Sequence, residues 1–425
     1  MSPIRNGHDR QITVGLDIGS SNITCAIGEI ISETKRIRLL GIATVPSAGI
    51  RRGTITNRDE LIDHLENALS EAEMMADTKV TKTILSITGE HIRCLNTQAA
   101  IALNRANGHP GGFAERAINE GDVSQVLDLA QAVSLPVDRD ILHTLPQEYL
   151  VDTLEEIKNP IGMTGRRLEG RVHLVTAATT AMNNLVSCVE ELGITVDGLV
   201  FQPLAAALAT LHEDEMELGV TLMEIGASTT NIAVYHGSAL RHSGVIPIGA
   251  SSITHDIAIM LQIGIDDAEK IKIKYASARS SMSSSKLEID LPASAGQLER
   301  SVPEQEVSRY VEARMQEIFQ LVIREISRAD IKDPLTYGIV ITGGGAQMRN
   351  IVPLAEKSLG VKVRQGTPIK IDGGQDFADG PGNATAMGLL LWPLYAMDHI
   401  HMQHSASDGF KDFFNRIRHT IEDLF

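Results

Sequence analysis

Two short turns of small residues, each placed after an apolar strand, are the parts of this chain best suited to phosphate chemistry. The two turns comprise Gly19, Ser20, Ser21 and Asn22 in one place and Gly226, Ala227, Ser228 and Thr229 in the other. Small residues let a backbone approach a ligand closely, so that its N–H groups face phosphate oxygens. A single turn of this kind is most often a plain hairpin loop, whereas a matched pair facing one cleft would clamp a triphosphate.

The two turns match each other in sequence and in setting. Residues 17–21 read DIGSS and residues 224–228 read EIGAS, at an offset of 207 positions in a chain of 425. Each turn joins two apolar segments, which predicts one β-hairpin over residues 12–28 and another over residues 220–235. A repeat at this distance indicates two similar α/β halves.

One acidic residue lies near the end of the apolar segment that precedes each turn. These residues are Asp17 and Glu224. Mg²⁺ keeps several of its waters and needs only one or two carboxylates from a protein. Asp17 and Glu224 are therefore the candidates to hold a hydrated Mg²⁺ beside the phosphates.

A third glycine-rich turn and one charged helix are candidates to bind the base and the ribose of a nucleotide. The turn follows the apolar strand 337–342, and its candidate residues are Gly343, Gly344, Gly345 and Met348. Consecutive glycines before a helix let a flat base lie on the backbone. Glu269 and Lys272 are three residues apart on an expected helix, where their side chains project together and can reach a ribose. Taken singly, the turn is also a plain strand-to-helix connection and the pair a solvated charged face.

Together these elements resemble the actin/Hsp70/sugar-kinase superfamily, which has two phosphate turns, an adenosine turn and two connecting helices. The connecting helices correspond here to residues 201–207 (FQPLAAA) and 382–388 (GNATAMG), whose small residues allow a close crossing at a hinge. The resemblance implies an α/β, two-lobed actin-like ATPase fold with duplicated halves, an inserted subdomain in each and ATP with Mg²⁺ as cofactors.

The segments between the repeats resemble the FtsA family of cell-division proteins. The matching stretches are SITGEHI at 86–92, ILH at 141–143, PQEY at 146–149 and NPIGM at 159–163. In that family the first insertion serves polymer contacts and recruitment of later division proteins, and the second receives the C-terminal tail of the tubulin-like protein FtsZ. The resemblance therefore implies self-association, FtsZ binding and a place at the division site on the cytoplasmic side of the inner membrane.

The order of these parts gives a domain division. The first-lobe core is expected at 1–85 and 172–198, with an inserted subdomain at 86–171. The second-lobe core is expected at 199–247 and 331–396, with an inserted subdomain at 248–330. A polar linker at 397–408 then leads to a terminal segment at 409–425.

Three positions bear on ATP hydrolysis, and two of them, Glu224 and Asn231, depart from the superfamily pattern. Glu224 stands where Asp is usual, Asn231 where many members carry Asp, and Gln202 precedes Pro203 at the first connecting helix. Superfamily ATPases place Gln or Glu to orient the attacking water. Gln202 is the catalytic candidate on this pattern, although it also fits a simple helix start. We expect nucleotide binding with at most slow hydrolysis.

The terminal segment predicts a membrane-binding amphipathic helix. Its apolar residues fall on one helical face: Phe410, Phe413, Phe414, Ile417, Ile421, Leu424 and Phe425. Half of the chain's 8 Phe lie in this segment, so its apolar face can enter a membrane interface. Its basic and acidic residues balance, so attraction to an anionic membrane surface is expected to be modest. The alternative is a helix packed against the body of the protein.

Composition excludes some classes and leaves others open. Lys+Arg 38 against Asp+Glu 54 makes the net charge −16, which argues against nucleic-acid binding. Three scattered Cys residues indicate a reducing compartment. Two alternatives share the expected fold: an actin-like adaptor of pilus assembly, and a kinase acting on a small molecule.

Overall fold

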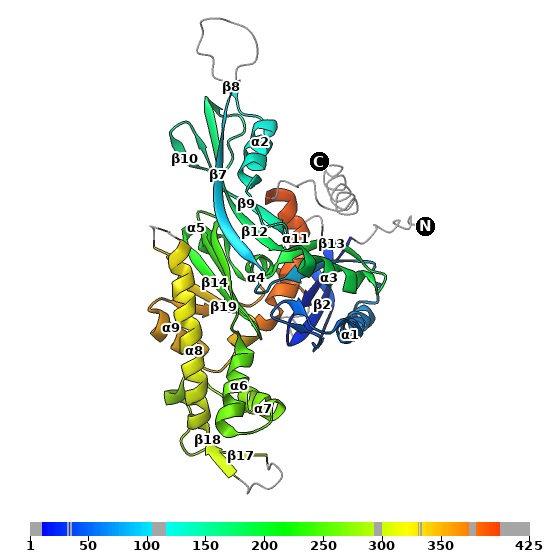
Figure 1. Ribbon diagram of the computed structural model, residues 1–425, viewed down its shortest axis with the longest axis vertical. Coiled ribbons are helices and arrows are strands. Elements are labelled where there is room, and N and C mark those ends of the chain that lie inside the picture. The colour runs from blue at the N-terminus through cyan, green and yellow to red at the C-terminus, as the bar shows by residue number, and fades with distance from the viewer. Residues whose placement is uncertain are drawn as a thin grey trace, which may run out of the picture.

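The chain folds into two α/β lobes, and each lobe carries a further subdomain (Figure 1). The computed structural model describes residues 11–103, 116–292, 300–373 and 380–399, apart from residues 32, 33, 35, 330, 332 and 333. The first inserted subdomain lies at one end of the long axis of the molecule, and the strand pair of the second lies at the other end. The two lobes lie between these ends.

The first lobe is built on a six-stranded sheet. In spatial order its strands are β13 (Thr195–Phe201), β6 (Lys82–Ile87), β1 (Ile12–Ile18), β2 (Asn22–Ile31), β3 (Arg36–Pro46) and β21 (Ile371–Asp372). Helices α1 (Arg58–Ala76) and α3 (Thr179–Glu190) pack against it. A small hairpin of β4 (Ile50–Arg51) and β5 (Thr54–Ile55) precedes α1. β21 belongs by sequence to the second half of the chain and pairs with β3, so it joins the two lobes at this sheet edge.

The first helix illustrates how local sequence sets an element's position. Asn57 caps α1, and its side chain accepts a hydrogen bond from the N–H of Glu60. The apolar stripe of the helix is buried at Leu61, Leu65, Ala68, Leu69 and Ala72. Burial of such side chains contributes about 1.5–3 kcal/mol for each leucine.

The second lobe repeats this plan with a five-stranded sheet. In spatial order its strands are β16 (Ala239–Ile246), β15 (Thr230–His236), β14 (Val220–Ile225), β19 (Ile339–Thr342) and β20 (Val363–Gln365). Helices α5 (Glu213–Leu218) and α9 (Ile351–Leu359) belong to the same lobe. β14 is buried along its whole length, as expected of a central strand covered on both faces.

The internal repeat is present in the strand register as well as in the sequence. In the first hairpin Asp17 pairs with Thr24, and in the second Glu224 pairs with Asn231. Both pairs are antiparallel, and each strand then runs parallel to a neighbour across the sheet, β1 with β6 and β14 with β19. Both predicted hairpins are confirmed, and the two halves have the same local topology.

The first inserted subdomain contains a four-stranded antiparallel sheet covered by one helix. Its elements are β10 (Leu154–Ile157), β9 (Arg139–Val151), β12 (Arg167–Ala178), β7 (Arg93–Ala102) and α2 (Glu120–Gln131). A two-stranded pair of β8 (Arg116–Ala117) and β11 (Thr164–Gly165) lies beside them. β12 continues to Ala178, past residue 171, where the sequence places the end of this subdomain.

The second inserted subdomain is mainly helical. It contains α6 (Ala250–Leu261), α7 (Ile265–Tyr275), a strand pair of β17 (Glu288–Leu291) and β18 (Arg300–Pro303), and the long helix α8 (Glu304–Ile326). The apolar stripe of α8 is buried at Val307, Val311, Met315, Ile318 and Val322. These side chains join the core of the second lobe, so α8 connects the insertion to that lobe.

Two helices cross between the lobes, as the small residues in their sequences predict. They are α4 (Gln202–Thr210) and α11 (Ala384–His399). A Cβ atom at Gly388 would lie 1.7 Å from the backbone oxygen of Ala205, so only glycine allows this approach. A Cβ atom at Gly15 of β1 would likewise lie 2.6 Å from the Leu389 Cβ atom. Glycine at these two crossings sets the distance between α11 and its neighbours.

The predicted membrane segment 409–425 lies outside the described residues, as do residues 400–408 of the predicted linker. Among the helices that the structure describes, none is long and apolar enough to cross a bilayer.

Candidate functional site

The two phosphate turns predicted from the sequence face each other in one cavity between the lobes. The Oγ atoms of Ser20 and Ser228 lie 2.7 Å apart, within hydrogen-bond distance. The cavity is lined by Ile18, Gly19, Ser20, Ile50, Gly53, Ser86, Ile87, Thr88, Leu185, Gln202, Gly226, Ala227, Ser228 and Thr229. Seven of the residues expected to act here, from both halves, therefore come together. Ser21 and Asn22 belong to the first turn but do not line the cavity.

The cavity is small in the observed arrangement. Its volume is about 50 Å³. A water needs about 10–15 Å³ of such volume, so this space holds a few waters. A triphosphate would fit only if the two turns moved apart. The crossing of α4 and α11 lies between the lobes and is the place where such a movement would be accommodated.

Each turn is held by the same internal hydrogen bond. The N–H of Gly19 donates to the oxygen of Asn22 at 3.0 Å, and the N–H of Gly226 donates to the oxygen of Thr229 at 2.9 Å. The second turn is fixed further by helix α6, because Ala250 donates its N–H to the oxygen of Gly226 at 2.9 Å. The shared bond shows that the sequence repeat extends to backbone geometry.

The turns retain the donors that a phosphate requires. The backbone N–H groups of Ser20, Ala227 and Ser228 form no hydrogen bond with any residue that the structure describes. With the two serine hydroxyls, they supply neutral donors around the cavity. Such donors, at turns without bulky side chains, fit the oxygens of a phosphate group.

The two acidic candidates, Asp17 and Glu224, are buried, and neither lines the cavity. Asp17 accepts hydrogen bonds from Ser86 at 2.5 Å and from the Gln202 amide at 3.1 Å. Glu224 accepts from the Asn231 amide at 2.9 Å and from the hydroxyl of Thr385. Burial raises the pKa of Asp17 to about 6 and the pKa of Glu224 to about 7, and the hydrogen bonds oppose these rises. Both carboxyls therefore change charge near neutral pH.

These two carboxyls fit the needs of a Mg²⁺ ion better than those of a metal held by protein ligands alone. Within the described ranges, no three His, Cys, Asp or Glu side chains gather as a metal-binding group. Mg²⁺ is commonly bound by one or two carboxylates together with waters and substrate phosphates. A divalent cation would also favour the ionised forms of Asp17 and Glu224, which burial disfavours.

Gln202 occupies the centre of a polar network that joins the lobes. Its amide nitrogen donates to Asp17, and its Oε1 atom accepts from the Asn231 amide at 3.0 Å. Asn231 in turn lies 2.7 Å from the hydroxyl of Thr88. Sequence reasoning identified Gln202 and Asn231 but missed Ser86, Thr88 and Thr385. Hydroxyl residues at strand ends and helix starts are too common for their spacing to have identified them.

The glycine triplet lies against the base of the second phosphate turn. Gly343 has φ 83°, and a Cβ atom there would lie 2.6 Å from the oxygen of Ile225. A Cβ atom at Gly345 would lie 2.4 Å from the Ile225 Cγ2 atom. At Gly344 a Cβ atom would meet nothing within 4 Å, and this residue is exposed. Close packing therefore requires glycine at two positions, whereas Gly344 faces open space that a flat base can use.

The ribose candidates also lie next to the second phosphate turn. Lys272 on α7 forms an ion pair with Glu269 at 2.7 Å and donates to the Thr254 hydroxyl of α6 at 2.9 Å. The side chain of Lys272 is 10% exposed and that of Glu269 is 40% exposed. Lys272 is thus mainly a structural cation, and Glu269 keeps an accessible carboxylate. Neither residue lines the cavity between the turns.

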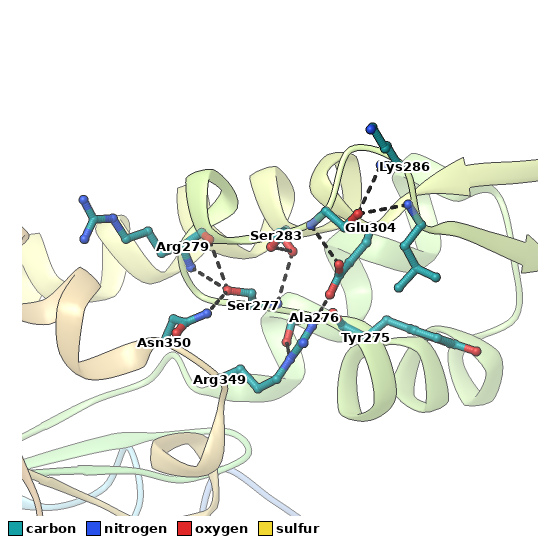
Figure 2. Close-up of polar contacts among 12 residues, drawn as sticks. Tyr275, Ala276, Ser277, Arg279, Ser283, Lys286, Glu304, Arg349 and Asn350 are labelled. Carbon is teal, nitrogen blue, oxygen red and sulfur yellow. Dashed lines mark hydrogen bonds and ion pairs between the residues drawn. The ribbon is translucent and has the colours of Figure 1, made fainter.

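The chain after the glycine triplet is fastened to the second inserted subdomain (Figure 2). Arg349 donates to the backbone oxygens of Tyr275 and Ala276 and forms an ion pair with Glu304 at the start of α8. Asn350 donates to the Ser277 hydroxyl at 2.9 Å. Met348, the last base-binding candidate, is half-buried at the start of this segment. The connection places the adenosine turn and the second insertion in one packed unit.

Comparisons with known proteins agree with this architecture. A family model described as "Cell division protein FtsA" matches residues 221–388, and one described as "SHS2 domain inserted in FTSA" matches residues 89–176. Among solved structures, the PilM-PilN type IV pilus biogenesis complex has a TM-score of 0.64 at 16% identity, over 90% of this chain and 98% of that one. MreB5 of Spiroplasma citri bound to AMPPNP has a TM-score of 0.50 at 16% identity, over 99% and 100%. At these identities the likeness shows the actin-like fold alone.

The sequence relatives decide between the families that share this fold. The chain is 37% identical over 413 residues to the cell division protein FtsA of Pseudomonas aeruginosa, which covers 97% of this chain and 96% of that protein. It is 38% identical to FtsA of Neisseria meningitidis over 90% of this chain and 89% of that protein. It is 34% identical to FtsA of Escherichia coli over 90% of each. On its sequence, its insertion and its actin-like fold, the chain belongs to the FtsA family of cell-division proteins.

Proposed function

We propose that this cell-division protein binds Mg·ATP between its lobes, with one phosphate turn on each side of the triphosphate. The observation that carries the proposal is the 2.7 Å approach of Ser20 and Ser228, two residues from repeated turns that line one cavity. Open space over Gly344 supports a base beside the second turn. Solved structures of the same fold, those of MreB5 from Spiroplasma citri, are described as bound to AMPPNP and to ADP.

Separate groups of residues are proposed to bind the phosphates, the Mg²⁺ ion, the base and the ribose. Backbone N–H groups and hydroxyls of residues 19–22 and 226–229 bind phosphate oxygens, and Asp17 with Glu224 holds the hydrated Mg²⁺. Gly343, Gly344, Gly345 and Met348 bind the base, and Glu269 with Lys272 binds the ribose. When bound, Mg·ATP would supply a compact polyanion between the two turns, which must stand further apart to hold it.

Slow turnover follows from the same geometry. Gln202 is the residue closest in type to one that orients water, but both ends of its amide are already engaged, by Asp17 and by Asn231. The Asp17 carboxyl, with a pKa of about 6, is held by Ser86 as well. We therefore infer that ATP acts chiefly as a conformational and polymer-stabilising ligand in this protein.

A direct binding measurement tests the site. Ser20→Asp places a negative charge where the phosphates would lie, and we expect Mg·ATP affinity to fall about tenfold or more. Ser70→Asp, at an exposed position of α1, adds the same charge outside the cleft and serves as control. Isothermal titration calorimetry gives both affinities, and thermal melting checks that each variant folds. Unchanged affinity in Ser20→Asp would place the nucleotide elsewhere.

The wider role is a membrane adaptor. We propose that the protein polymerises on the inner face of the cytoplasmic membrane, that residues 409–425 lie in the membrane interface, and that the filament holds FtsZ there and recruits later division proteins. The support is the run of apolar residues on one expected face of that segment. Several weak tails on one filament would bind far more tightly than one. Electron microscopy on a lipid monolayer with ATP, with and without residues 409–425, tests this; filaments that bind equally well without them would contradict it.

The second inserted subdomain is the proposed docking site of the FtsZ tail. Its helices α6 and α7 expose large apolar side chains, with Ile259 71%, Met260 56% and Ile273 74% exposed. Exposed apolar side chains that lie near one another are typical of a protein-binding surface. Met260→Glu with Ile273→Glu should abolish capture by an immobilised FtsZ tail peptide. The matched control is Met74→Glu with Met75→Glu on α1, whose side chains are 77% and 61% exposed in the native protein. Equal loss in both double variants would contradict the assignment.

A further inference from the structure

One arginine lies against the phosphate cavity without lining it. Arg52 is at the tip of the β4–β5 hairpin, between Ile50 and Gly53, which both line the cavity. Its backbone N–H donates to the Oγ atom of Ser228 in the second phosphate turn at 3.2 Å. The base of this side chain is therefore held next to the proposed phosphate position.

The cavity itself has no cationic side chain. None of its lining residues, all of which belong to the described part of the chain, is Lys or Arg. Behind its wall lies Asp17, whose carboxyl is hydrogen-bonded to the lining residues Ser86 and Gln202 and adds negative charge when ionised. A triphosphate bound there would need positive charge beyond a single Mg²⁺. Arg52 is a basic residue whose backbone N–H contacts Ser228 in the cavity wall.

The hairpin tip is fixed in place by close packing. Arg52 has φ 51° and Gly53 has φ 77°, so the chain turns through two left-handed residues. A Cβ atom at Gly53 would lie 1.9 Å from the backbone oxygen of Thr88. The hairpin tip therefore packs closely against the loop after β6. The position of the Arg52 backbone is thus set by its surroundings, while its side chain remains 47% exposed.

That side chain forms an exposed ion pair with the first residues of the inserted subdomain. The Nη1 atom of Arg52 lies 2.9 Å from the Oε1 atom of Glu90, and the Glu90 N–H donates to the Arg52 oxygen at 3.3 Å. The family model for the inserted domain begins at residue 89. Exposed ion pairs are weak because water screens both charges, so a phosphate can displace Glu90 at little cost.

We propose that Arg52 binds the terminal phosphate of the nucleotide, exchanging Glu90 for the γ-phosphate. A guanidinium pairs well with phosphate oxygens because its donors form a planar fork. When a triphosphate is bound, the exchange releases Glu90 at the start of the inserted subdomain. When a diphosphate is bound, the ion pair between Arg52 and Glu90 forms again. The state of the nucleotide is thereby transmitted to the subdomain proposed to make polymer and partner contacts. This inference rests on the nucleotide site proposed above.

Discrimination between a triphosphate and a diphosphate tests the assignment. We compare Mg·AMPPNP with Mg·ADP by calorimetry, because AMPPNP carries a γ-phosphate that is not readily hydrolysed. Arg52→Asn removes the cation and keeps a residue type that tolerates positive φ. We expect about tenfold weaker binding of Mg·AMPPNP, from the loss of a charge-assisted hydrogen bond, and less than about twofold change for Mg·ADP. Arg51→Asn removes an adjacent exposed charge and should change neither.

The ion pair with Glu90 gives a second, independent readout. Glu90→Gln removes the competitor, so Mg·AMPPNP should bind about two- to threefold more tightly, within the range of an exposed ion pair. In the double variant with Arg52→Asn this gain should disappear. A gain that persists without Arg52 would mean that Glu90 acts only through its own charge, which overturns the exchange.

Failure of the inference can be told from failure of the underlying site. If the unmodified protein binds Mg·AMPPNP and Ser20→Asp weakens it, but Arg52→Asn weakens both nucleotides equally or neither, then the site stands and the role of Arg52 is wrong. If the unmodified protein binds neither nucleotide, both proposals fall together.

Discussion

The hydroxyl of Thr88 lies 2.7 Å from the Oδ1 atom of Asn231, and this hydrogen bond joins the first lobe to the second. Thr88 follows β6 directly before residue 89, where the match to the inserted-domain family model begins, and Asn231 lies in β15 of the second lobe. The Asn231 amide nitrogen donates to both Gln202 and Glu224. One buried side chain therefore contacts Thr88, the catalytic candidate Gln202 and the metal candidate Glu224. The cleft is therefore crossed by a continuous polar network.

Removing the Asn231 amide should destabilise this network. Asn231 is 1% exposed, so Asn231→Ala removes one of the two donors to the buried Glu224 carboxyl and the donor to the Gln202 Oε1 atom. We expect a loss of about 1–3 kcal/mol in the free energy of unfolding, measured by urea denaturation. Asn183→Ala, at an exposed position on α3, is the control and should change stability by less than about 0.5 kcal/mol. Equal stabilities for the two variants would show that the network contributes nothing.

Stability without nucleotide should fall as pH rises through the neutral range. Burial raises the pKa of Asp17 from 3.8 to about 6 and that of Glu224 from 4.5 to about 7. Between these limits the folded protein binds more protons than the unfolded chain, so the favourable contribution is complete below about pH 4 and is lost as pH rises to about 7. Glu224→Gln should flatten this part of the profile, measured by denaturation at pH 5, 6 and 7.5.

The matching exposed carboxyl provides the control for this profile. Asp59→Asn, in the first turn of α1, should leave the slope unchanged because its side chain is exposed. In the proposed site Mg²⁺ would bind the ionised carboxyls, so Mg·ATP affinity should increase over the same pH range. A slope in Glu224→Gln equal to that of the unmodified protein would mean that this carboxyl does not titrate there.

Substitutions at two neighbouring glycines should have different effects, one on nucleotide binding and the other on stability. A side chain at Gly344 meets open space, so Gly344→Leu should keep the melting temperature within about 2 °C and weaken Mg·ATP binding by blocking the base. A side chain at Gly345 meets Ile225 at 2.4 Å, so Gly345→Leu should lower the melting temperature markedly. Calorimetry and thermal melting measure both effects. Normal ATP affinity in Gly344→Leu would show that the adenosine turn is misplaced.

The terminal segment should control membrane binding independently of the nucleotide. Phe413→Glu with Phe414→Glu introduces charge on the apolar face, and we expect loss of co-sedimentation with anionic liposomes while Mg·ATP affinity is unchanged. Asn415→Glu with His419→Glu adds equal charge on the opposite face of the expected helix. Persistent sedimentation of the Phe variant, or release of both variants, would contradict an anchor that acts through one apolar face.

Local sequence determined most of the separate elements. Apolar spacing alone predicts both hairpins, and α1 and α8 each bury one apolar stripe with the spacing of a helix. Secondary structure depends on neighbours along the chain, which explains why these predictions hold. The repeat at an offset of 207 further indicated two similar halves, and its shared turn geometry is confirmed by the matching hydrogen bonds of Gly19 and Gly226.

Only the tertiary structure decided what meets across the cleft. The contacts of Thr88 with Asn231, Arg52 with Ser228 and Thr385 with Glu224 join residues more than a hundred positions apart. No periodicity in the sequence relates such residues, because their meeting depends on how two folded lobes pack around α4 and α11. The elevated pKa values of Asp17 and Glu224 have the same origin, since burial in the folded protein removes the water that would stabilise their charge. Residue types and spacing thus determined the parts of the site, and long-range packing decided their partners and their protonation.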